Sequence, residues 1–181
     1  MVCNLSELQT FAFSNTFLNK RNEPFTIRPL DETLHDGLIE TYLAYEPKNS
    51  FNGLPPINED ACVKWVKGMI DTGANIIALS MNNIIWGHAA LFTVSKNLCE
   101  LFVAVSSMYQ NIGIGTELTR SSINISDILG FDKIWLSVEQ SNIRALHVYL
   151  KCGFDLISKG CFDDNEMILD LECYRKKMEQ G

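Results

Sequence analysis

Two glycines stand where a strand gives way to a helix, in the stretch Gln110-x-x-Gly113-x-Gly115. The first turn of a helix carries unpaired N–H groups and the positive end of the helix dipole, so it can bind an anion. Because glycine has no Cβ, the backbone there can approach a phosphate group closely. A tight turn alone explains the isolated pattern equally well. The chemistry that this stretch suggests is phosphate binding.

Two common phosphate-binding loops do not fit the stretch. The dinucleotide fingerprint requires a third glycine, at a position where this chain has Leu118. The Walker loop requires Gly-Lys-Ser/Thr, and no lysine lies between Lys96 and Lys133. Neither loop can therefore explain the two glycines.

A second motif, Asn142-x-x-Ala145-x-x-x-Tyr149-x-x-x-Gly153-Phe154, comes after the next strand. On a helix these positions lie along one face. A tyrosine hydroxyl that reaches a reacting group can act as a general acid. Taken by itself, the pattern is also that of a core tyrosine and of a glycine that ends a helix.

The elements that must position these motifs follow from hydrophobic periodicity and capping residues. The expected order is strand, two helices, three strands, helix, strand, helix and two strands. This is an α/β mixture with an antiparallel meander and a βαβ crossover. Strands are expected at 25–30, 75–81, 84–94, 98–107, 132–139, 154–158 and 166–173, and helices after Asp31, at 58–73, at 114–129 and from Ser141 or Asn142.

The two motifs and the elements between them, in this order, resemble the GNAT-type N-acetyltransferases over about residues 25–172. The resemblance implies a GNAT-like mixed, mostly antiparallel sheet of about seven strands flanked by about four helices and splayed at the acyl-CoA site. It implies acetyl-CoA (coenzyme A) as co-substrate and a single acetyltransferase domain over 25–181, after an N-terminal arm or extension over 1–24. The cofactor-binding residues that it implies are Phe102, Val103, Ala104, Val105, Gln110, Asn111, Ile112, Gly113, Ile114, Gly115, Thr116, Asn142, Ala145 and Tyr149.

The reaction that the resemblance implies is direct attack of a primary amine on the acetyl thioester in a ternary complex. Tyr149 would lie near the sulfur and donate a proton to the leaving thiolate. A backbone N–H near Val103 would stabilise the oxyanion.

The general base is less well matched. The two positions where members of the family carry a glutamate fall on Cys99 and Ser137 here. Glu100 and Glu139 are the nearest carboxylates and the candidate catalytic bases, and a water chain is the alternative. Period-two alternation turns Glu100 to the other face of its strand unless a bulge corrects it. His88 is interpreted as a structural histidine.

The resemblance also indicates where the acceptor binds, because the family selects its acceptor mostly with two segments. These are the segment between the first two helices, here 45–58 with Tyr45, Glu46 and Phe51 as candidate residues, and the last hairpin, here 158–166. Acidic residues in both suit a cationic amine, although acidic loops are common. The acceptor is expected to be a small molecule, peptide or protein, whose identity the residues do not give.

Composition limits the function further. The 181 residues carry a formal net charge of −7 without a basic stripe, which argues against nucleic acid as a partner. No run approaches the ~20 apolar residues that span a bilayer, and no secretory signal is visible, so a cytoplasmic protein without a membrane partner is expected. The six scattered cysteines contain no C-x-x-C pair and suit reduced thiols, with no metal site.

The two ends of the chain are interpreted from composition alone. The basic run 175–177 is expected to be a solvated tail. The N-terminal segment is expected to pack on the body, to pack on a second subunit in a homodimer, or to be a partly ordered tail.

Two other functions remain open at this point. The first is a non-catalytic acyl-CoA-binding or regulatory module of the same fold, which the missing glutamates favour. The second is a different nucleotide-binding α/β protein.

Overall fold

The computed structural model describes residues 13–48, 55–159 and 164–179. Within these ranges, eight strands form one sheet in the order β1-β2-β3-β4-β5-β6-β8-β7. All neighbours are antiparallel except β5 and β6. This mixed, mostly antiparallel sheet confirms the predicted fold class. The strands are β1 Asn15–Leu18, β2 Pro24–Pro29, β3 Ala74–Ser80, β4 Ile85–Ser95, β5 Leu98–Val105, β6 Lys133–Glu139, β7 Asp155–Lys159 and β8 Asp164–Asp170.

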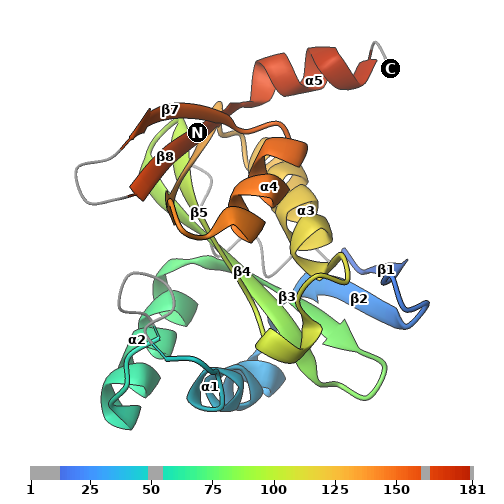
Figure 1. The fold of residues 1–181 in the computed structure, drawn as a ribbon, viewed down its shortest axis with the longest axis vertical. Coiled ribbons are helices and arrows are strands. Elements are labelled where there is room, and N and C mark those ends of the chain that lie inside the picture. Colours follow the sequence, from blue (N-terminus) through green and yellow to red (C-terminus); the bar gives the residue numbers. More distant parts are fainter. Residues whose placement is uncertain (1–12, 49–54, 160–163, 180–181) are drawn as a thin grey trace.

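The sheet opens between β5 and β6, which are parallel neighbours. β5 pairs with β6 at just three positions, Leu98–Glu100 against Lys133–Trp135. Beyond these pairs β5 continues to Val105 alongside β4. The second half of β5 therefore has a strand on one side only, which is the splay that the resemblance implied (Figure 1).

Helices cover both faces of the sheet, and each face has its own apolar cluster. α1 (His35–Leu43) and α2 (Glu59–Thr72) pack on one face around Leu38, Tyr42 and Val66. α3 (Ile114–Ile128) and α4 (Ile143–Lys151) pack on the other, with Leu118 and Ile123 at the centre. Figure 1 shows the pair α1 and α2 well apart from α3 and α4.

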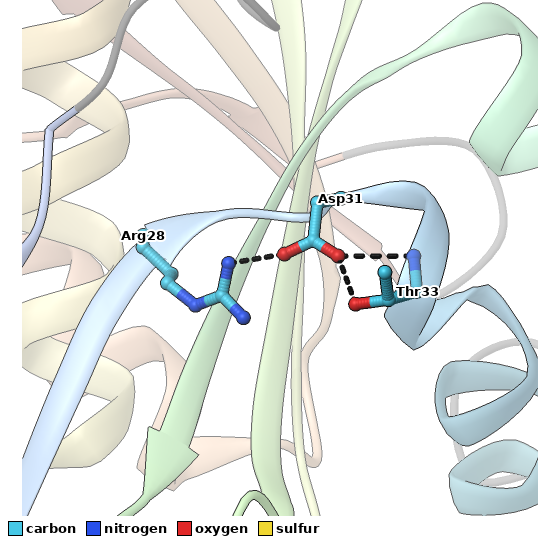
Figure 2. Close-up of polar contacts among 3 residues, drawn as sticks. All are labelled: Arg28, Asp31 and Thr33. Carbon is cyan, nitrogen blue, oxygen red and sulfur yellow. Dashed lines mark hydrogen bonds and ion pairs between the residues drawn. The ribbon is translucent and has the colours of Figure 1, made fainter.

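The capping residues explain why several of these helices begin where they do. The Asn58 side chain accepts a hydrogen bond from the Ala61 N–H and starts α2, as predicted. Asp31 accepts from the Thr33 N–H at 3.0 Å and also contacts the Thr33 hydroxyl and Arg28 (Figure 2). The Thr33 hydrogen bond, followed by Arg28, lowers the pKa of Asp31. Here Asp31 caps a short 3-10 helix, Glu32–Leu34, which leads into α1.

A buried polar chain ties α1 and the end of α2 to the middle of the sheet. The Tyr42 hydroxyl lies 2.8 Å from His88 Nδ1, and His88 Nε2 lies 2.9 Å from Asn75 Oδ1. The Asn75 amide group donates to the carbonyls of Gly73 and Met69 at 2.7 and 3.0 Å. Since the amide oxygen can only accept, Nε2 carries the proton and Nδ1 accepts from Tyr42. His88 is thus a neutral, fully paired structural histidine.

The ends of the chain contain two elements that the sequence did not predict. Residues 15–18 of the N-terminal segment form the edge strand β1 and pair with β2, so this part of the segment packs on the body. The last strand was expected to reach residue 173 and to precede a solvated tail, but α5 (Leu171–Glu179) begins at Leu171. The Asp170 carboxylate accepts from the Cys173 N–H at 3.0 Å, so it caps this helix. That hydrogen bond also lowers the pKa of Asp170.

Candidate active site

A cavity of about 800 Å³ lies where β5 and β6 diverge. Its volume is in the range typical of small-molecule and cofactor sites. It collects residues from the β1–β2 turn, the end of β5, the loop before α3, the end of β6 and the exposed side of α4. The lining includes Lys20, Tyr45, Val103, Val105, Gln110, Asn111, Ile112, Gly113, Gly115, Thr116, Glu139, Asn142, Arg144, Ala145, Tyr149 and Lys151.

The loop before α3 presents its backbone to this cavity. Gly113 is the N-cap of α3 with φ 101°, and Asn111 has φ 64°, both in the left-handed region. Ile112, between these two residues, and Ile114, directly after Gly113, are buried and anchor the loop to the core. Among the described residues no side chain caps α3, so the N–H groups of its first turn are available to an anion.

The four predicted cofactor residues on β5 divide between the two faces of the sheet. Val103 and Val105 line the cavity, whereas Phe102 and Ala104 belong to the cluster under α1 and α2. Strand alternation makes this division inevitable, because successive side chains point to opposite faces. Ile114 is likewise buried in the core rather than part of the lining.

The backbone of β5 faces the gap left by β6. The Val105 carbonyl accepts hydrogen bonds from the Tyr45 hydroxyl at 3.2 Å and from Gln110 Nε2 at 3.0 Å. It therefore points away from β4. Backbone alternation gives the N–H and C=O groups of Val103 the same direction, toward the open side.

Gln110 bridges the gap between the sheet and α4. Its Nε2 donates to the Val105 carbonyl, and its Oε1 accepts from Arg144 Nη1 at 3.3 Å. Tyr45 is buried, and its hydroxyl lies 3.4 Å from the Gln110 amide nitrogen. One glutamine thus connects the segment after α1, the end of β5 and the start of α4.

The motif on α4 reaches the cavity with the three residues that the sequence singled out. Asn142 caps the helix by accepting from the Ala145 N–H at 3.2 Å. Tyr149 is 7% exposed and packs edge-on against Phe154, with ring centroids 5.7 Å apart. Its hydroxyl makes no hydrogen bond to any residue that the structure describes. Burial, followed by the neighbouring Cys152 thiol, raises the pKa of Tyr149 well above its ordinary value, so the group is a neutral phenol at neutral pH.

The two candidate bases differ in whether they line the cavity. Glu139 lines the cavity, and its carboxylate accepts from the Ser141 hydroxyl at 3.2 Å. Glu100 does not line it, because the register of β4 and β5 runs unbroken from Gly87–Val105 to Thr93–Cys99 and no bulge turns its side chain. Partial burial raises the pKa of Glu100. The structure therefore brings Glu139, and not Glu100, together with Tyr149.

Of the predicted acceptor residues that the structure describes, Tyr45 lines the cavity and Glu46 does not. Tyr45 lines the cavity, next to Pro47. Glu46 is exposed and is not part of the lining. Phe51 and residues 160–163 of the last hairpin lie outside the described residues.

Sequence reasoning missed three basic residues of the lining, Lys20, Arg144 and Lys151. Arg144 and Lys151 lie on the motif helix at i+2 and i+9 from Asn142, off the face that Asn142, Ala145 and Tyr149 share, so helical spacing did not indicate them. Lys20 had no signal either, because a turn close to the N-terminus meets the glycine loop only in the folded chain.

The described residues contain neither a metal-binding cluster nor a membrane-spanning helix. Within residues 13–48, 55–159 and 164–179, no three or more His, Cys, Asp or Glu side chains gather as a metal ion would require. In the same part of the chain, the helices are too short or too polar to cross a bilayer.

Comparison with known proteins identifies the family. The model of the acetyltransferase (GNAT) family, whose enzymes use acetyl-CoA as co-substrate, matches residues 32–154. An N-alpha-acetyltransferase of Sulfurisphaera tokodaii is 28% identical over 88 residues, which cover 46% of this chain. The matched stretch spans about half of that relative, 53% of its length.

Two solved structures share the fold at low sequence identity. The GNAT domain of S. lividans PAT superposes with a TM-score of 0.74 at 11% identity, covering 87% of this chain and 96% of that domain. Spermidine N-acetyltransferase from Vibrio cholerae, in complex with CoA and spermine, gives a TM-score of 0.68 at 19% identity, covering 83% and 98%. Together with the family match over most of its length, the cavity and its two motifs show that this chain belongs to the acetyltransferase (GNAT) family.

Proposed function

We propose that the protein is an N-acetyltransferase that moves an acetyl group from acetyl-CoA to a primary amine in a ternary complex. One observation carries the proposal. The glycine loop and the open edge of β5 line one cavity together with the Tyr149 side chain, which comes from the later helix α4.

The residues around this cavity fit the chemical parts of the cofactor. Its pyrophosphate would be bound by backbone N–H groups of residues 110–116, where positive φ angles and the helix start present several donors. Its pantetheine amides would pair with the peptide groups of Val103 and with the Val105 N–H, as a further strand would, since the Val105 carbonyl already accepts from Tyr45 and Gln110. Asn142 and Ala145 would contact it from α4.

The role proposed for Tyr149 follows from its position and protonation. The amine nitrogen bonds to the acetyl carbon as the carbon–sulfur bond breaks, and the departing thiolate takes the phenolic proton. Glu139, or a water molecule held by it, would receive the proton that the amine loses. Passed on through water in the cavity, this proton would restore the Tyr149 phenol and leave Glu139 ionised. Holding both reactants in one cavity can remove ~7 kcal/mol or more of the barrier, and a positioned acid adds about 10²-fold in rate.

The acceptor proposed is a primary amine on a small molecule, peptide or protein. The relatives support this class, because one is named an N-alpha-acetyltransferase and another a spermidine N-acetyltransferase. Tyr45 and Pro47, from the segment between α1 and α2, form one wall of the cavity. We place the acceptor entrance at this wall.

The test is turnover with acetyl-CoA and a panel of amines. The panel contains spermidine, peptides with free N-termini and the same peptides with blocked N-termini. Free CoA should be quantified by chromatography rather than with a thiol reagent, because Cys173 is exposed and would react. Amine-dependent CoA release supports the proposal. CoA binding without turnover on any amine would favour the non-catalytic acyl-CoA-binding module.

The glycine loop offers a separate prediction. Gly113→Ala should lower the free energy of unfolding by about 1–2 kcal/mol, because alanine is strained at φ 101°. If the loop relaxes to relieve that strain, the affinity for CoA should fall about tenfold. Denaturant unfolding and calorimetric titration measure the two effects.

Gly68→Ala is the matched control for this prediction. Gly68 lies in the middle of α2, and an added Cβ there meets no atom within 4 Å. The substitution should raise the unfolding free energy by roughly 0.5–1 kcal/mol and leave CoA affinity unchanged. Equal behaviour of the two variants would argue against a special role for Gly113.

A further inference from the structure

The turn between β1 and β2 forms part of the cavity wall, although it precedes the residues that match the family model. Leu18, Asn19 and Lys20 all line the cavity, and the family match starts at residue 32. In Figure 1 the two strands lie beside the start of α3. This part of the chain therefore adds surface to a site whose known motifs lie elsewhere.

Hydrogen bonds within the turn fix its shape. Asn19 is buried, and its side-chain oxygen accepts from the N–H groups of Arg21 and Glu23 at 2.8 and 3.0 Å. Its amide nitrogen donates to the Glu23 carboxylate at 2.8 Å. Asn22 completes the turn with φ 59°. The backbone that carries Lys20 is thus held in one conformation.

The turn is also fixed against the glycine loop. The Lys20 N–H donates to the carbonyl of Ile112 at 2.9 Å, one residue before the N-cap of α3. Aromatic rings of the hairpin, of β4 and of the segment after β5 pack against one another in a row. Phe17 stacks on Phe25, Phe25 lies against Trp86, and Trp86 stacks on Tyr109, with centroids 5.6, 6.2 and 4.8 Å apart.

The charge at this position has no protein partner in the described part of the chain. Lys20 is exposed, and its ammonium group makes no ion pair or hydrogen bond there. Glu117, the acidic residue of the first turn of α3, is paired with Arg120 at 2.8 Å. A cation left at the edge of a cavity, in a chain of net charge −7, is suited to an anionic ligand.

We propose that Lys20 binds a phosphate group of acetyl-CoA, so that the β1–β2 hairpin contributes to cofactor binding. The inference rests on the proposed function, since it concerns the same cavity. The bond from Lys20 to Ile112 places the lysine backbone directly beside the loop whose N–H groups would bind the pyrophosphate. The side chain needs only to extend along the cavity wall for its ammonium group to reach the cofactor's phosphates.

The test compares four proteins in calorimetric titrations, namely the wild type, Lys20→Met, Lys20→Arg and Arg21→Met. Arg21 is the matched control, because it lies in the same turn, is exposed, carries the same charge and does not line the cavity. Lys20→Met should raise the Kd for CoA about 5- to 10-fold, less than the loss of a buried charge-assisted hydrogen bond, because Lys20 is exposed. Lys20→Arg and Arg21→Met should stay within about twofold.

Two further ligands identify the phosphate. If Lys20→Met weakens dephospho-CoA as much as CoA, the lysine binds the pyrophosphate. If dephospho-CoA binds equally well to the wild type and to Lys20→Met, the lysine binds the 3′-phosphate. Pantetheine, which has no phosphate, should bind both proteins alike in ligand-observed NMR. An equal loss for pantetheine would mean that the substitution disturbs the cavity itself and would overturn the proposal.

The remaining outcomes separate this inference from the proposed function. A wild type that does not bind CoA contradicts the proposed function, and the role of Lys20 with it. Tight binding of CoA by wild type and Lys20→Met alike, or an equal loss in Arg21→Met, contradicts the role of Lys20 alone. Loss of the difference between wild type and Lys20→Met at high salt is expected, because exposed charges are screened.

Discussion

Replacing Tyr149 with phenylalanine should lower kcat about 100-fold while CoA affinity stays within about twofold. The substitution removes only the hydroxyl and keeps the ring that packs against Phe154. Because that hydroxyl bonds to no described residue, its loss should change the unfolding free energy little. The missing proton donor leaves the thiolate to depart unprotonated, which slows the chemical step alone. Steady-state kinetics with a responsive amine, together with a CoA titration, measure both quantities.

Tyr174→Phe is the control for this prediction. Tyr174 is a half-buried tyrosine on α5 that packs against the same apolar cluster but does not line the cavity. Its variant should keep wild-type kcat. If Tyr149→Phe raised KM without lowering kcat, the tyrosine would be a binding residue and not an acid.

A raised tyrosine pKa also bears on the pH profile. Burial keeps Tyr149 in its acid form through neutral pH and above. The alkaline limb of kcat in the wild type should therefore not come from its ionisation.

Acidification should destabilise the protein through His88, by about 3 kcal/mol between pH 6.5 and 4. Burial lowers the pKa of His88 from 6.5 to about 3. In this window the unfolded chain binds a proton at His88 that the folded protein does not. Stability therefore rises with pH through the window, is fully present above 6.5 and is lost as the pH falls. Urea unfolding at pH 7 and at pH 4 measures the difference.

His88→Leu isolates this contribution. At pH 7 the variant should be less stable by about 3 kcal/mol, because the Tyr42 hydroxyl and the Asn75 amide oxygen lose their partner in the core. It should also lose less stability on acidification than the wild type does, since the titrating group is gone. His147→Asn, at an exposed position of α4, should match the wild type in both respects. A pH dependence that His88→Leu leaves unchanged would contradict the assignment.

Local signals gave much of the fold and most of the cofactor cavity. Asn58 and Asn142 were predicted correctly as helix starts because each side chain accepts from an N–H group only three residues ahead. The splay of β5 came from the resemblance, not from periodicity. α5 was missed because alternation continues through Leu169 and Leu171, and only the carboxylate of Asp170 interrupts it.

The errors at the site have a long-range origin. Whether Glu100 reaches the cavity depends on the unbroken register of β5 with β4, and Glu139 lines it where β5 and β6 diverge. No local pattern fixes either arrangement. Lys20 meets Ile112 across more than ninety residues of sequence. Such contacts appear only once the sheet has assembled, so periodicity and capping could not predict them.

The two apolar clusters, one on each face of the sheet, have a consequence for how such a protein can change. Substitutions among α1 and α2 repack one cluster, whereas the cofactor motifs rest on the other. Effects at separated, non-contacting sites usually add. A library of variants confined to the α1–α2 face should therefore yield new acceptor specificities while the cluster that carries the cofactor motifs keeps its stability. The Tyr42–His88 bond and the hydrogen bonds of the Tyr45 hydroxyl with Val105 and Gln110 should be kept intact.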